Sequence, residues 1–502
     1  MVPDDAVLYK ALASHDARFD GVFFVGVTST GIYCRPVCTA RTPKPANCRF
    51  FATAEAAEKA AFRPCLRCRP ELAPGTAPVD DAHRIANLVA SRIQDGMFDG
   101  ASNLEEVAAT FGWSSRQIRR VVNRELGVSP IELVLTRRLL LAKQLLTETT
   151  LPITEIAFAS GFASLRRFND AFSKRYGMPP TRLRKVARGV SAMPDFVADT
   201  FTLQLAYRPP FDWEGILGFL RTRAFAGVEY VDSESYSRTI CVGAYAGWLQ
   251  VRNAPQKNVL LVELTHGLMP VLSLLLSRLR NLFDLNARPD MISEQLMRDP
   301  ALTDIVKRNT GMRVPGSFDG FELAVRAILG QQITVKGATT LAGRYANAFG
   351  ERIETPHAGL SHLTPTVNRI ACVGIESVAS LGIVRSRAAA ILALADEIAS
   401  GRLTLEAGAD PNAVMNQLIA LPGIGKWTAH YIAMRALRWP DAFPKEDLVL
   451  RNRLGGVTPA RAEEMSQQWR PWRSYATLHL WQNAPPMPAV KKRIMRNPPV
   501  TA

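Results

Sequence analysis

Two close pairs of cysteines constrain the N-terminal part of this chain more than any other feature of its sequence. Three residues separate Cys34 from Cys38, two separate Cys65 from Cys68, and a longer segment joins the pairs. Paired cysteines at this spacing are typical of a tetrahedral site in which four thiolates bind one zinc ion. The sequence therefore predicts a small zinc-bound α/β domain, which we place at residues 1–76.

The other cysteines and the apolar segments favour a cytoplasmic protein. The chain has seven cysteines, an odd number, and its first residues carry acids instead of the basic and apolar regions of a secretory signal. The most apolar segment, residues 258–279, contains Glu263, His266 and Pro270, and it is predicted to form a strand, a turn and a buried helix. We expect no membrane association, and we expect Cys48 to be a small buried apolar residue.

Length and charge predict several domains and a polyanionic partner. A chain of 502 residues is too long for one hydrophobic core, because cores rarely grow beyond about 300 residues. The 61 lysines and arginines exceed the 45 acidic residues and give a formal net charge of +16. Because basic proteins release counterions when they bind nucleic acids, nucleic acid is the leading candidate partner.

The sequence around the cysteine pairs resembles the methyl-phosphotriester receptor of the Ada family, over 22-VFFVGVTSTGIYCRPVCTAR-41 and 61-AFRPCLRCRPE-71. The resemblance implies one zinc ion that is both structural and catalytic, because a zinc-bound thiolate stays nucleophilic enough to take a methyl group. By the match to GIYCRPVC it implies that Cys34 is the acceptor and that Cys38, Cys65 and Cys68 complete the site. The alternative for paired cysteines considered alone is a purely structural zinc site.

Methylation at such a centre implies a change in DNA affinity. Zinc with four thiolates has a formal charge of about −2, and methylation of one sulfur leaves about −1. Repulsion from DNA phosphates then decreases, so the product of repair raises affinity for DNA. The arginines expected to contact phosphates there are Arg35, Arg41, Arg63, Arg67 and Arg69.

The next segment repeats itself at an offset of about fifty residues. Residues 103–130 are echoed by residues 153–180, and in each copy apolar residues at helical spacing flank a turn containing Gly112 or Gly161. This pattern predicts two helix-turn-helix units. The polar side of the second helix in each unit presents arginines suited to phosphates and base edges, namely Arg116, Arg119, Arg120, Arg166 and Arg167.

A helical linker, residues 131–149, joins the two units. A single basic amphipathic helix is as often a solvated surface as a DNA-binding one, but two linked copies favour DNA binding. The arrangement resembles the AraC-type DNA-binding domain, which we place at residues 78–190. The resemblance implies promoter DNA as a partner, and RNA polymerase as a further partner of the activated protein.

The C-terminal part begins with alternating apolar and polar residues, typical of strands, and continues with helical patterns. Its best motif is 418-LIALPGIGKWTAHYIAM-434, in which two helices meet at a turn where Gly423 and Gly425 let backbone N–H groups approach a phosphate. This part resembles the AlkA-type DNA-3-methyladenine glycosylases. It implies an α+β subdomain at residues 201–285 and a helix-hairpin-helix domain at 286–495.

The resemblance also implies the catalytic residue. Counting twenty residues from the hairpin tryptophan Trp427 reaches Asp447, where AlkA carries its catalytic aspartate. A carboxylate below the sugar stabilises the positive charge that develops when the glycosidic bond breaks. The alternative role is a helix N-cap, since Asp447 precedes an apolar run. Glu446 stands where AlkA has a second aspartate, so the two roles could fall on neighbouring residues.

Matching to AlkA further implies a pocket for a flipped base, lined by Phe219, Trp427, Tyr431 and Trp481, whose rings attract a cationic methylated purine. Core packing is the alternative for each aromatic alone. Gln332 falls where AlkA inserts an apolar wedge into DNA, and Gln482 replaces an aromatic beside the pocket. Trp427 occupies the place of the lysine of bifunctional relatives, and no cysteine follows Cys372, so we expect neither lyase activity nor an iron–sulfur cluster.

We therefore expect a multidomain protein that excises alkylated bases such as 3-methyladenine and 7-methylguanine from double-stranded DNA. Its zinc-bound cysteine is expected to take methyl groups from phosphotriesters and to activate promoter binding. The alternative is a transcription regulator whose glycosylase-like part binds DNA without catalysis. Repair of O6-methylguanine is rejected, because neither Cys241 nor Cys372 lies in the required Pro-Cys-His-Arg sequence.

Overall fold

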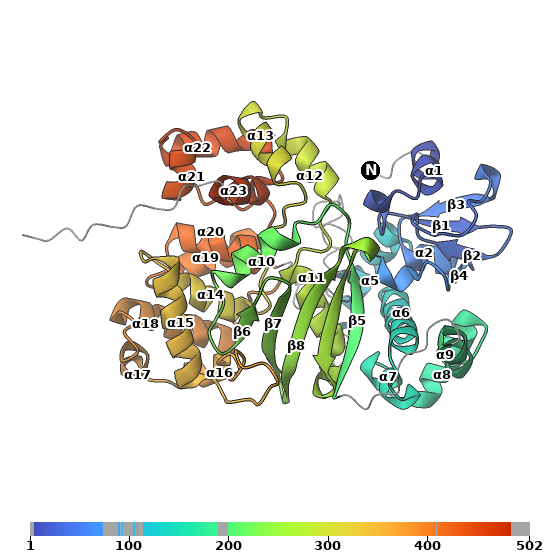
Figure 1. Ribbon diagram of the computed structural model, residues 1–502, viewed down its shortest axis with the longest axis horizontal. Helices are drawn as coiled ribbons and strands as arrows, with labels where there is room; N and C mark the ends of the chain where they lie inside the picture. Colours follow the sequence, from blue (N-terminus) through green and yellow to red (C-terminus); the bar gives the residue numbers. More distant parts are fainter. Residues whose placement is uncertain are drawn as a thin grey trace, which may run out of the picture.

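The computed structural model describes residues 5–73, 89–90, 93, 104–105, 108, 114–188, 199–407 and 409–482. A small four-stranded sheet and a group of helices lie on one side of Figure 1, a five-stranded sheet lies in the middle, and a larger group of helices lies on the other side. The protein is thus multidomain, with α+β and mainly α parts, as the sequence predicts.

The four-stranded sheet brings the two halves of the cysteine pattern together. Its strands run in the order β3-β1-β2-β4, and β2 pairs with β4 in parallel through Tyr33 and Pro64. Because parallel strands end at the same edge, Cys34 at the end of β2 and Cys65 just after β4 lie side by side. The elements are α1 (Asp5–Ala13), β1 (Phe24–Val27), β2 (Ile32–Cys34), β3 (Cys48–Phe51), α2 (Ala54–Lys59) and β4 (Arg63–Pro64).

In the next part of the chain that the structure describes lie α5 (Ser115–Leu126), α6 (Pro130–Glu148), α7 (Ile153–Ala159), α8 (Leu165–Tyr176) and α9 (Pro180–Arg188). The helices α5 and α8 each begin after a serine cap and end at a glycine with a left-handed backbone, Gly127 and Gly177. The second predicted helix-turn-helix is α7, the turn at Gly161 and α8. In the first unit, Gly112 and most of the preceding helix lie outside the described residues.

The five-stranded sheet is antiparallel throughout, in the order β5-β9-β8-β7-β6. Its elements are β5 (Thr200–Ala206), α10 (Trp213–Arg221), β6 (Glu229–Val231), β7 (Ser235–Val242), β8 (Tyr245–Ala254) and β9 (Val259–Thr265), followed by α11 (Leu272–Leu282). The apolar segment 258–279 is therefore a strand, a short 3-10 helix and a buried helix, as predicted. Within the described residues, no helix combines the length and apolarity needed to cross a membrane.

The remaining described chain is helical apart from loops and isolated bridges, and its helices share one apolar core. They are α12 (Pro289–Leu296), α13 (Pro300–Arg308), α14 (Gly320–Leu329), α15 (Val335–Phe349), α16 (Val367–Ala371), α17 (Ile375–Ala379), α18 (Arg385–Ala399), α19 (Pro411–Ala420), α20 (Lys426–Arg435), α21 (Leu448–Arg453), α22 (Pro459–Met465) and α23 (Arg473–Gln482). The predicted hairpin is formed by α19, the turn at Pro422–Gly425 and α20.

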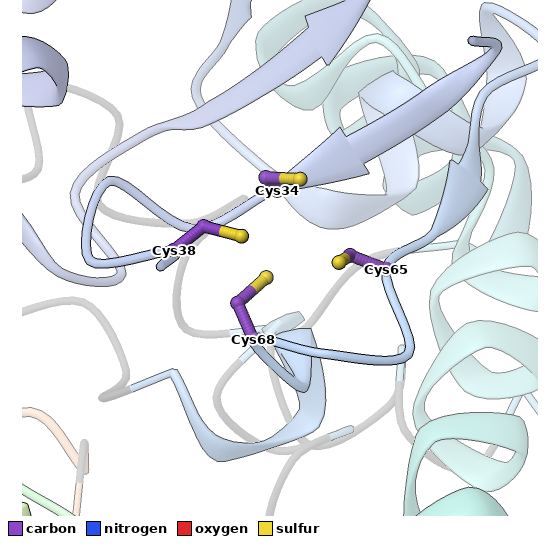
Figure 2. A group of neighbouring side chains, drawn as sticks. All are labelled: Cys34, Cys38, Cys65 and Cys68. Carbon is purple, nitrogen blue, oxygen red and sulfur yellow. The ribbon is translucent and has the colours of Figure 1, made fainter. Parts of the chain in front are cut away.

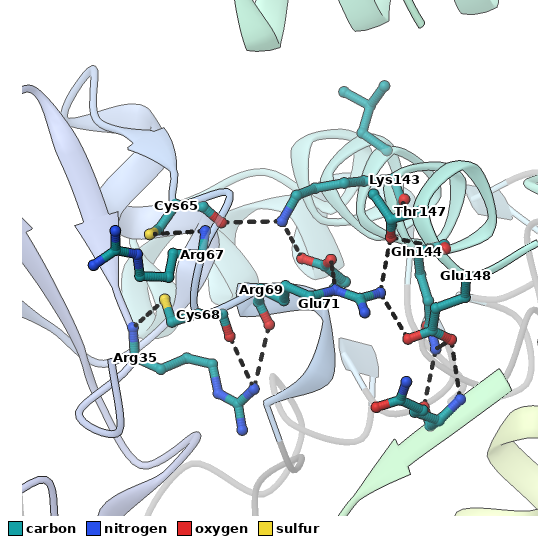
Figure 3. Close-up of polar contacts among 12 residues, drawn as sticks. Arg35, Cys65, Arg67, Cys68, Arg69, Glu71, Lys143, Gln144, Thr147 and Glu148 are labelled. Atoms are coloured by element: carbon teal, nitrogen blue, oxygen red, sulfur yellow. Dashed lines mark hydrogen bonds and ion pairs between the residues drawn. The ribbon is translucent and has the colours of Figure 1, made fainter. Parts of the chain in front are cut away.

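Helix α6 joins the cysteine-bearing sheet to the rest of the molecule (Figure 3). The fully buried ammonium group of Lys143 donates to the carbonyl oxygen of Cys65 at 3.1 Å and pairs with the buried Glu71 carboxylate. Arg69 extends the contact, since its guanidinium binds Glu71 at 3.1 Å and Glu148 at 2.6 Å. A row of buried charges thus fastens the segment Cys65–Glu71 along α6.

The same helix contacts the edge strand of the larger sheet. The carboxylate of Glu148 accepts from the backbone N–H of Gln204 in β5 at 3.0 Å, and the Gln144 amide donates to the Gln204 carbonyl at 2.9 Å. Apolar residues of α6, α7 and α8 share a core with β5 and its neighbouring strands. Helix α6 therefore contacts the cysteine-bearing sheet, the neighbouring helices of the helix-turn-helix part and the edge of the larger sheet.

We expect Lys143→Met to lower the free energy of unfolding by about 3 kcal/mol, because the buried Glu71 carboxylate loses one of its two cations and keeps only Arg69. Denaturant unfolding followed by circular dichroism measures this loss. The control is Arg298→Ala, which breaks an exposed ion pair with Glu294 at 3.4 Å and should cost less than about 1 kcal/mol. Equal effects of the two substitutions would contradict the assigned role of Lys143.

Candidate metal centre and candidate active site

The four paired cysteines converge on one point (Figure 2). The sulfur atoms of Cys34, Cys38, Cys65 and Cys68 all lie within 4.8 Å of one another, and the first three residues are buried. Zinc bound to four thiolates at about 2.3 Å separates the sulfurs by about 3.8 Å in a tetrahedron. The donor set and its spacing therefore fit a zinc ion.

Backbone N–H groups near the cluster donate hydrogen bonds to cysteine sulfur atoms and so favour the thiolate form. The N–H of Arg35 donates to the Cys68 sulfur at 3.3 Å, and the N–H of Arg67 donates to the Cys65 sulfur at 3.4 Å. Donors aimed at sulfur stabilise the charged form, which is the form that binds a metal.

The arginines near this centre divide into two groups. Arg35 is buried, forms an ion pair with Asp20 and donates to the Cys68 carbonyl at 3.1 Å, so its prediction as a phosphate contact is wrong. Arg69 is half-buried in its ion pairs and serves the contact with α6 instead. Three arginines remain exposed and available to an anion: Arg41, Arg63 and Arg67.

The expectation for Cys48 is also wrong. This residue is half-exposed at the start of β3, and its thiol donates to the Lys44 carbonyl at 3.4 Å. It is partly buried and packs against the edge of the small N-terminal core instead of lying inside it.

The helix-turn-helix arginines form two open cationic surfaces. In α5, Ile118 and Val122 are buried on one side of the helix, and in α8 the buried side carries Phe168 and Phe172. The predicted arginines are all exposed on these two helices: Arg116, Arg119, Arg120, Arg166 and Arg167.

In the larger helical part, Asp447 is the most heavily hydrogen-bonded candidate. The indole N–H of Trp427 donates to its Oδ2 at 2.8 Å, and the indole N–H of Trp481 donates to its Oδ1 at 3.1 Å. The backbone N–H of Leu450 donates to Oδ1 at 2.7 Å, so Asp447 is also the N-cap of α21. The cap and the candidate catalytic carboxylate are one residue, and Glu446 does not share the two roles.

The predicted pocket aromatics lie together beside this carboxylate. Trp427 and Tyr431 stack at 5.3 Å between ring centroids with planes 11° apart, and Trp481 lies 6.3 Å from Tyr431. Phe219 from α10 reaches the same place, because the Arg435 guanidinium lies 4.8 Å above its ring and 5.5 Å from the Tyr431 ring.

Two arginines of this region were not identified from the sequence. The Arg435 guanidinium donates to the Tyr431 hydroxyl at 2.7 Å, and Arg223 lies 3.9 Å from the centroid of the Phe219 ring. Burial alone would raise the pKa of Tyr431, but these two guanidinium groups lower it below its usual range. Each arginine lies four residues after the aromatic it contacts, and this spacing is a signal that could have revealed both.

The turn residues also lie as the motif suggests. Gly423 has a φ of +83°, and Gly425 precedes α20, whose first backbone N–H groups have no side-chain cap. A Cβ atom at Gly425 would meet nothing within 4 Å, so this helix end is open to an anion. Gln332 is exposed between α14 and α15, and Gln482 is exposed at the end of α23.

Four sequence models of protein families match successive parts of the chain. They are the metal binding domain of Ada at residues 7–71, a helix-turn-helix domain at 107–186, the AlkA N-terminal domain at 202–319 and the HhH-GPD superfamily of base excision DNA repair proteins at 325–474. The cysteine cluster lies inside the first match, and Asp447 with the hairpin lies inside the last.

Curated relatives show the same combination. DNA-3-methyladenine glycosylase 2 of Escherichia coli is 36% identical over 55% of this chain and 95% of its own length. The bifunctional transcriptional activator/DNA repair enzyme AdaA of Bacillus subtilis is 33% identical over 38% of this chain and 85% of its own. The probable bifunctional transcriptional activator/DNA repair enzyme AlkA of Mycobacterium tuberculosis is 39% identical over 94% of this chain and 95% of its own length. The chain therefore belongs to the family of bifunctional transcriptional activator/DNA repair enzymes represented by that AlkA protein.

Proposed function

We propose that the C-terminal half is a monofunctional DNA-3-methyladenine glycosylase that removes alkylated purines by hydrolysis. The observation that carries this proposal is the Asp447 carboxylate, held by two indole N–H groups at the edge of a stacked aromatic pocket. The relatives named as 3-methyladenine glycosylases support the substrate class. DNA is the partner, and residues 201–285 and 286–495 are the proposed extent of the two glycosylase subdomains.

In the proposed reaction the damaged nucleotide is flipped out of the helix while the hairpin turn at Gly423 and Gly425 holds a phosphate. The rings of Phe219, Trp427, Tyr431 and Trp481 receive the cationic base. As the bond from C1′ to the base breaks, positive charge develops on the sugar, and the Asp447 carboxylate stabilises it and orients a water molecule. The hydrolysis leaves the free base and an abasic sugar. Trp427 provides no amine for a Schiff base, so no strand cleavage is proposed.

We also propose that the N-terminal half, within residues 1–76, repairs methylated phosphotriesters. Zinc, when bound, keeps the four thiols deprotonated, which is the state needed for attack. The Cys34 sulfur forms a bond to the methyl carbon while the bond from that carbon to the phosphate oxygen breaks, and the phosphodiester leaves as an anion. The metal binding domain of Ada supports this assignment.

The proposed consequence of methylation is regulation through the helix-turn-helix segment, within residues 78–190. Exposed arginines of α5 and α8 are suited to promoter DNA, and we propose that RNA polymerase is recruited once the protein is bound. The relatives named as transcriptional activators support this role.

We expect Asp447→Asn to lower single-turnover excision of 3-methyladenine at least about 100-fold, because the charge it stabilises exists only in the transition state. Asparagine is itself a good N-cap, so α21 and the binding of DNA should be retained. Asp410→Asn, which changes the cap of α19 in the same way, is the matched control and should excise at the wild-type rate. Excision by Asp447→Asn at the control rate would favour the alternative of a non-catalytic DNA-binding module.

Cys34→Ser is expected to abolish methyl transfer from phosphotriester DNA while leaving base excision unchanged, because the two centres lie in separate domains. Mass spectrometry of peptides from the treated wild type locates the methyl group. Cys48→Ser, outside the four-cysteine cluster, should retain transfer. A methyl group found on Cys38, Cys65 or Cys68 would show that Cys34 is not the acceptor.

Methylated protein should bind promoter DNA about tenfold or more tightly at low salt, because one negative charge has been removed close to phosphates. The gain should shrink as the salt concentration rises, and excision rates should not change. Titrations of methylated and unmethylated protein at two salt concentrations measure the effect. Equal affinities at low salt would rule out an electrostatic switch.

A further inference from the structure

Two successive glutamines in the turn between α14 and α15 differ in their surroundings. Gln332 is exposed and has a φ of 53°, in the left-handed region that non-glycine residues rarely adopt. Gln331 directs its side chain to the hairpin instead. Its amide nitrogen donates to the Gly423 carbonyl at 2.9 Å and to the Thr428 hydroxyl at 3.1 Å.

These two hydrogen bonds reach the parts of the hairpin that matter for the proposed reaction. Gly423 belongs to the turn proposed to hold a phosphate, and Thr428 is buried in α20 directly after Trp427. The Gln331 amide therefore bridges the phosphate-binding turn and the helix that supplies pocket aromatics. Thr428 is buried, whereas Gly423 is exposed but lies close to α18, since a Cβ atom at Gly423 would lie 3.2 Å from the Ala390 methyl group.

A third element contacts the backbone of the same residue. The guanidinium of Arg387 in α18 donates to the carbonyl oxygen of Gln331. The side chain and the main chain of Gln331 are thus held by different helices, and the residue that follows adopts the strained conformation. A left-handed non-glycine residue costs on the order of 1 to 3 kcal/mol and persists only where its surroundings fix it.

We propose that Gln331 is a positioning residue that sets Gln332 at a fixed distance from the phosphate-binding hairpin, so that Gln332 fills the gap left in the duplex when a base is flipped. This inference rests on the proposed glycosylase function. It predicts that Gln331 matters for opening a base pair and not for breaking the glycosidic bond. The contacts are hydrogen bonds at the margin of the core, so their loss should leave the fold intact.

The test compares two DNA substrates that carry one 7-methylguanine in the same strand. In the first the damaged base is paired with cytosine, and in the second it faces a one-nucleotide gap, so no base pair has to be broken. Gln331→Ala is expected to lower single-turnover excision from the paired substrate about tenfold more than from the gapped one. Gln331→Glu, which keeps the length but cannot donate to the Gly423 carbonyl, should behave in the same way. Asp447→Asn should lower both rates equally.

Two further variants make the result decisive. Gln295→Ala removes a comparable exposed hydrogen bond outside the hairpin, from its amide to the Gln468 carbonyl at 2.9 Å, and should leave the ratio of the two rates at the wild-type value. The double variant Gln331→Ala with Gln332→Ala should match Gln332→Ala alone, because Gln331 acts through its neighbour.

The outcomes separate this inference from the function on which it rests. Equal losses on both substrates, an unchanged ratio, or additive effects in the double variant would each overturn the positioning role. A wild-type protein that releases the base from neither substrate would instead overturn the glycosylase function itself. Melting temperatures of all variants, measured by calorimetry, show whether a loss of activity is a loss of fold; a lower melting temperature with equal rate losses identifies a merely structural residue.

Discussion

Helix α6 and the buried charges along it join the cysteine-bearing sheet to the larger sheet. Lys143 is fully buried, and its ammonium group is stable there only because the Glu71 carboxylate and the Cys65 carbonyl oxygen surround it. One end of this network lies at the cysteine cluster, and the other lies at β5, the edge of the larger sheet. The contact that orders the segment Cys65–Glu71 is therefore also the contact that places the candidate zinc centre against the rest of the protein.

In the candidate active site, one side chain has more than one structural role. Asp447 ends the loop before α21 as its N-cap, and the same carboxylate accepts two indole N–H groups. The tryptophans assigned to the base pocket by their sequence are thus also the groups that orient the carboxylate. A group held by three donors loses little freedom when a substrate arrives, which is the preorganisation that stabilisation of a developing charge requires.

Much of this arrangement could be predicted because its signals are local. The cysteine spacing and the turn around Gly423 each involve a few neighbouring residues whose types restrict the backbone. Each copy of the repeat of about fifty residues likewise shows a local helical pattern around a turn. The errors have a common cause. Arg35 and Cys48 were assigned by residue type, but the exposure of a side chain depends on its tertiary contacts. Arg35 is buried in an ion pair with Asp20, and Cys48 packs only against the edge of the small core. Arg223 and Arg435 each follow an aromatic residue by four positions, but only the fold shows that both pairs lie beside the candidate pocket.

The sequence by itself determined which kinds of unit the chain contains and which residue types could do chemistry in each, because helical period, turn glycines and metal-ligand spacing are properties of short segments. Only the tertiary structure decided which of those residues meet. The parallel pairing of β2 with β4 brings Cys34 to Cys65, and Trp427 of α20 and Trp481 of α23 both donate to Asp447 at the start of α21. Such contacts join positions far apart in the chain, and they depend on how whole faces pack together, which no single segment encodes.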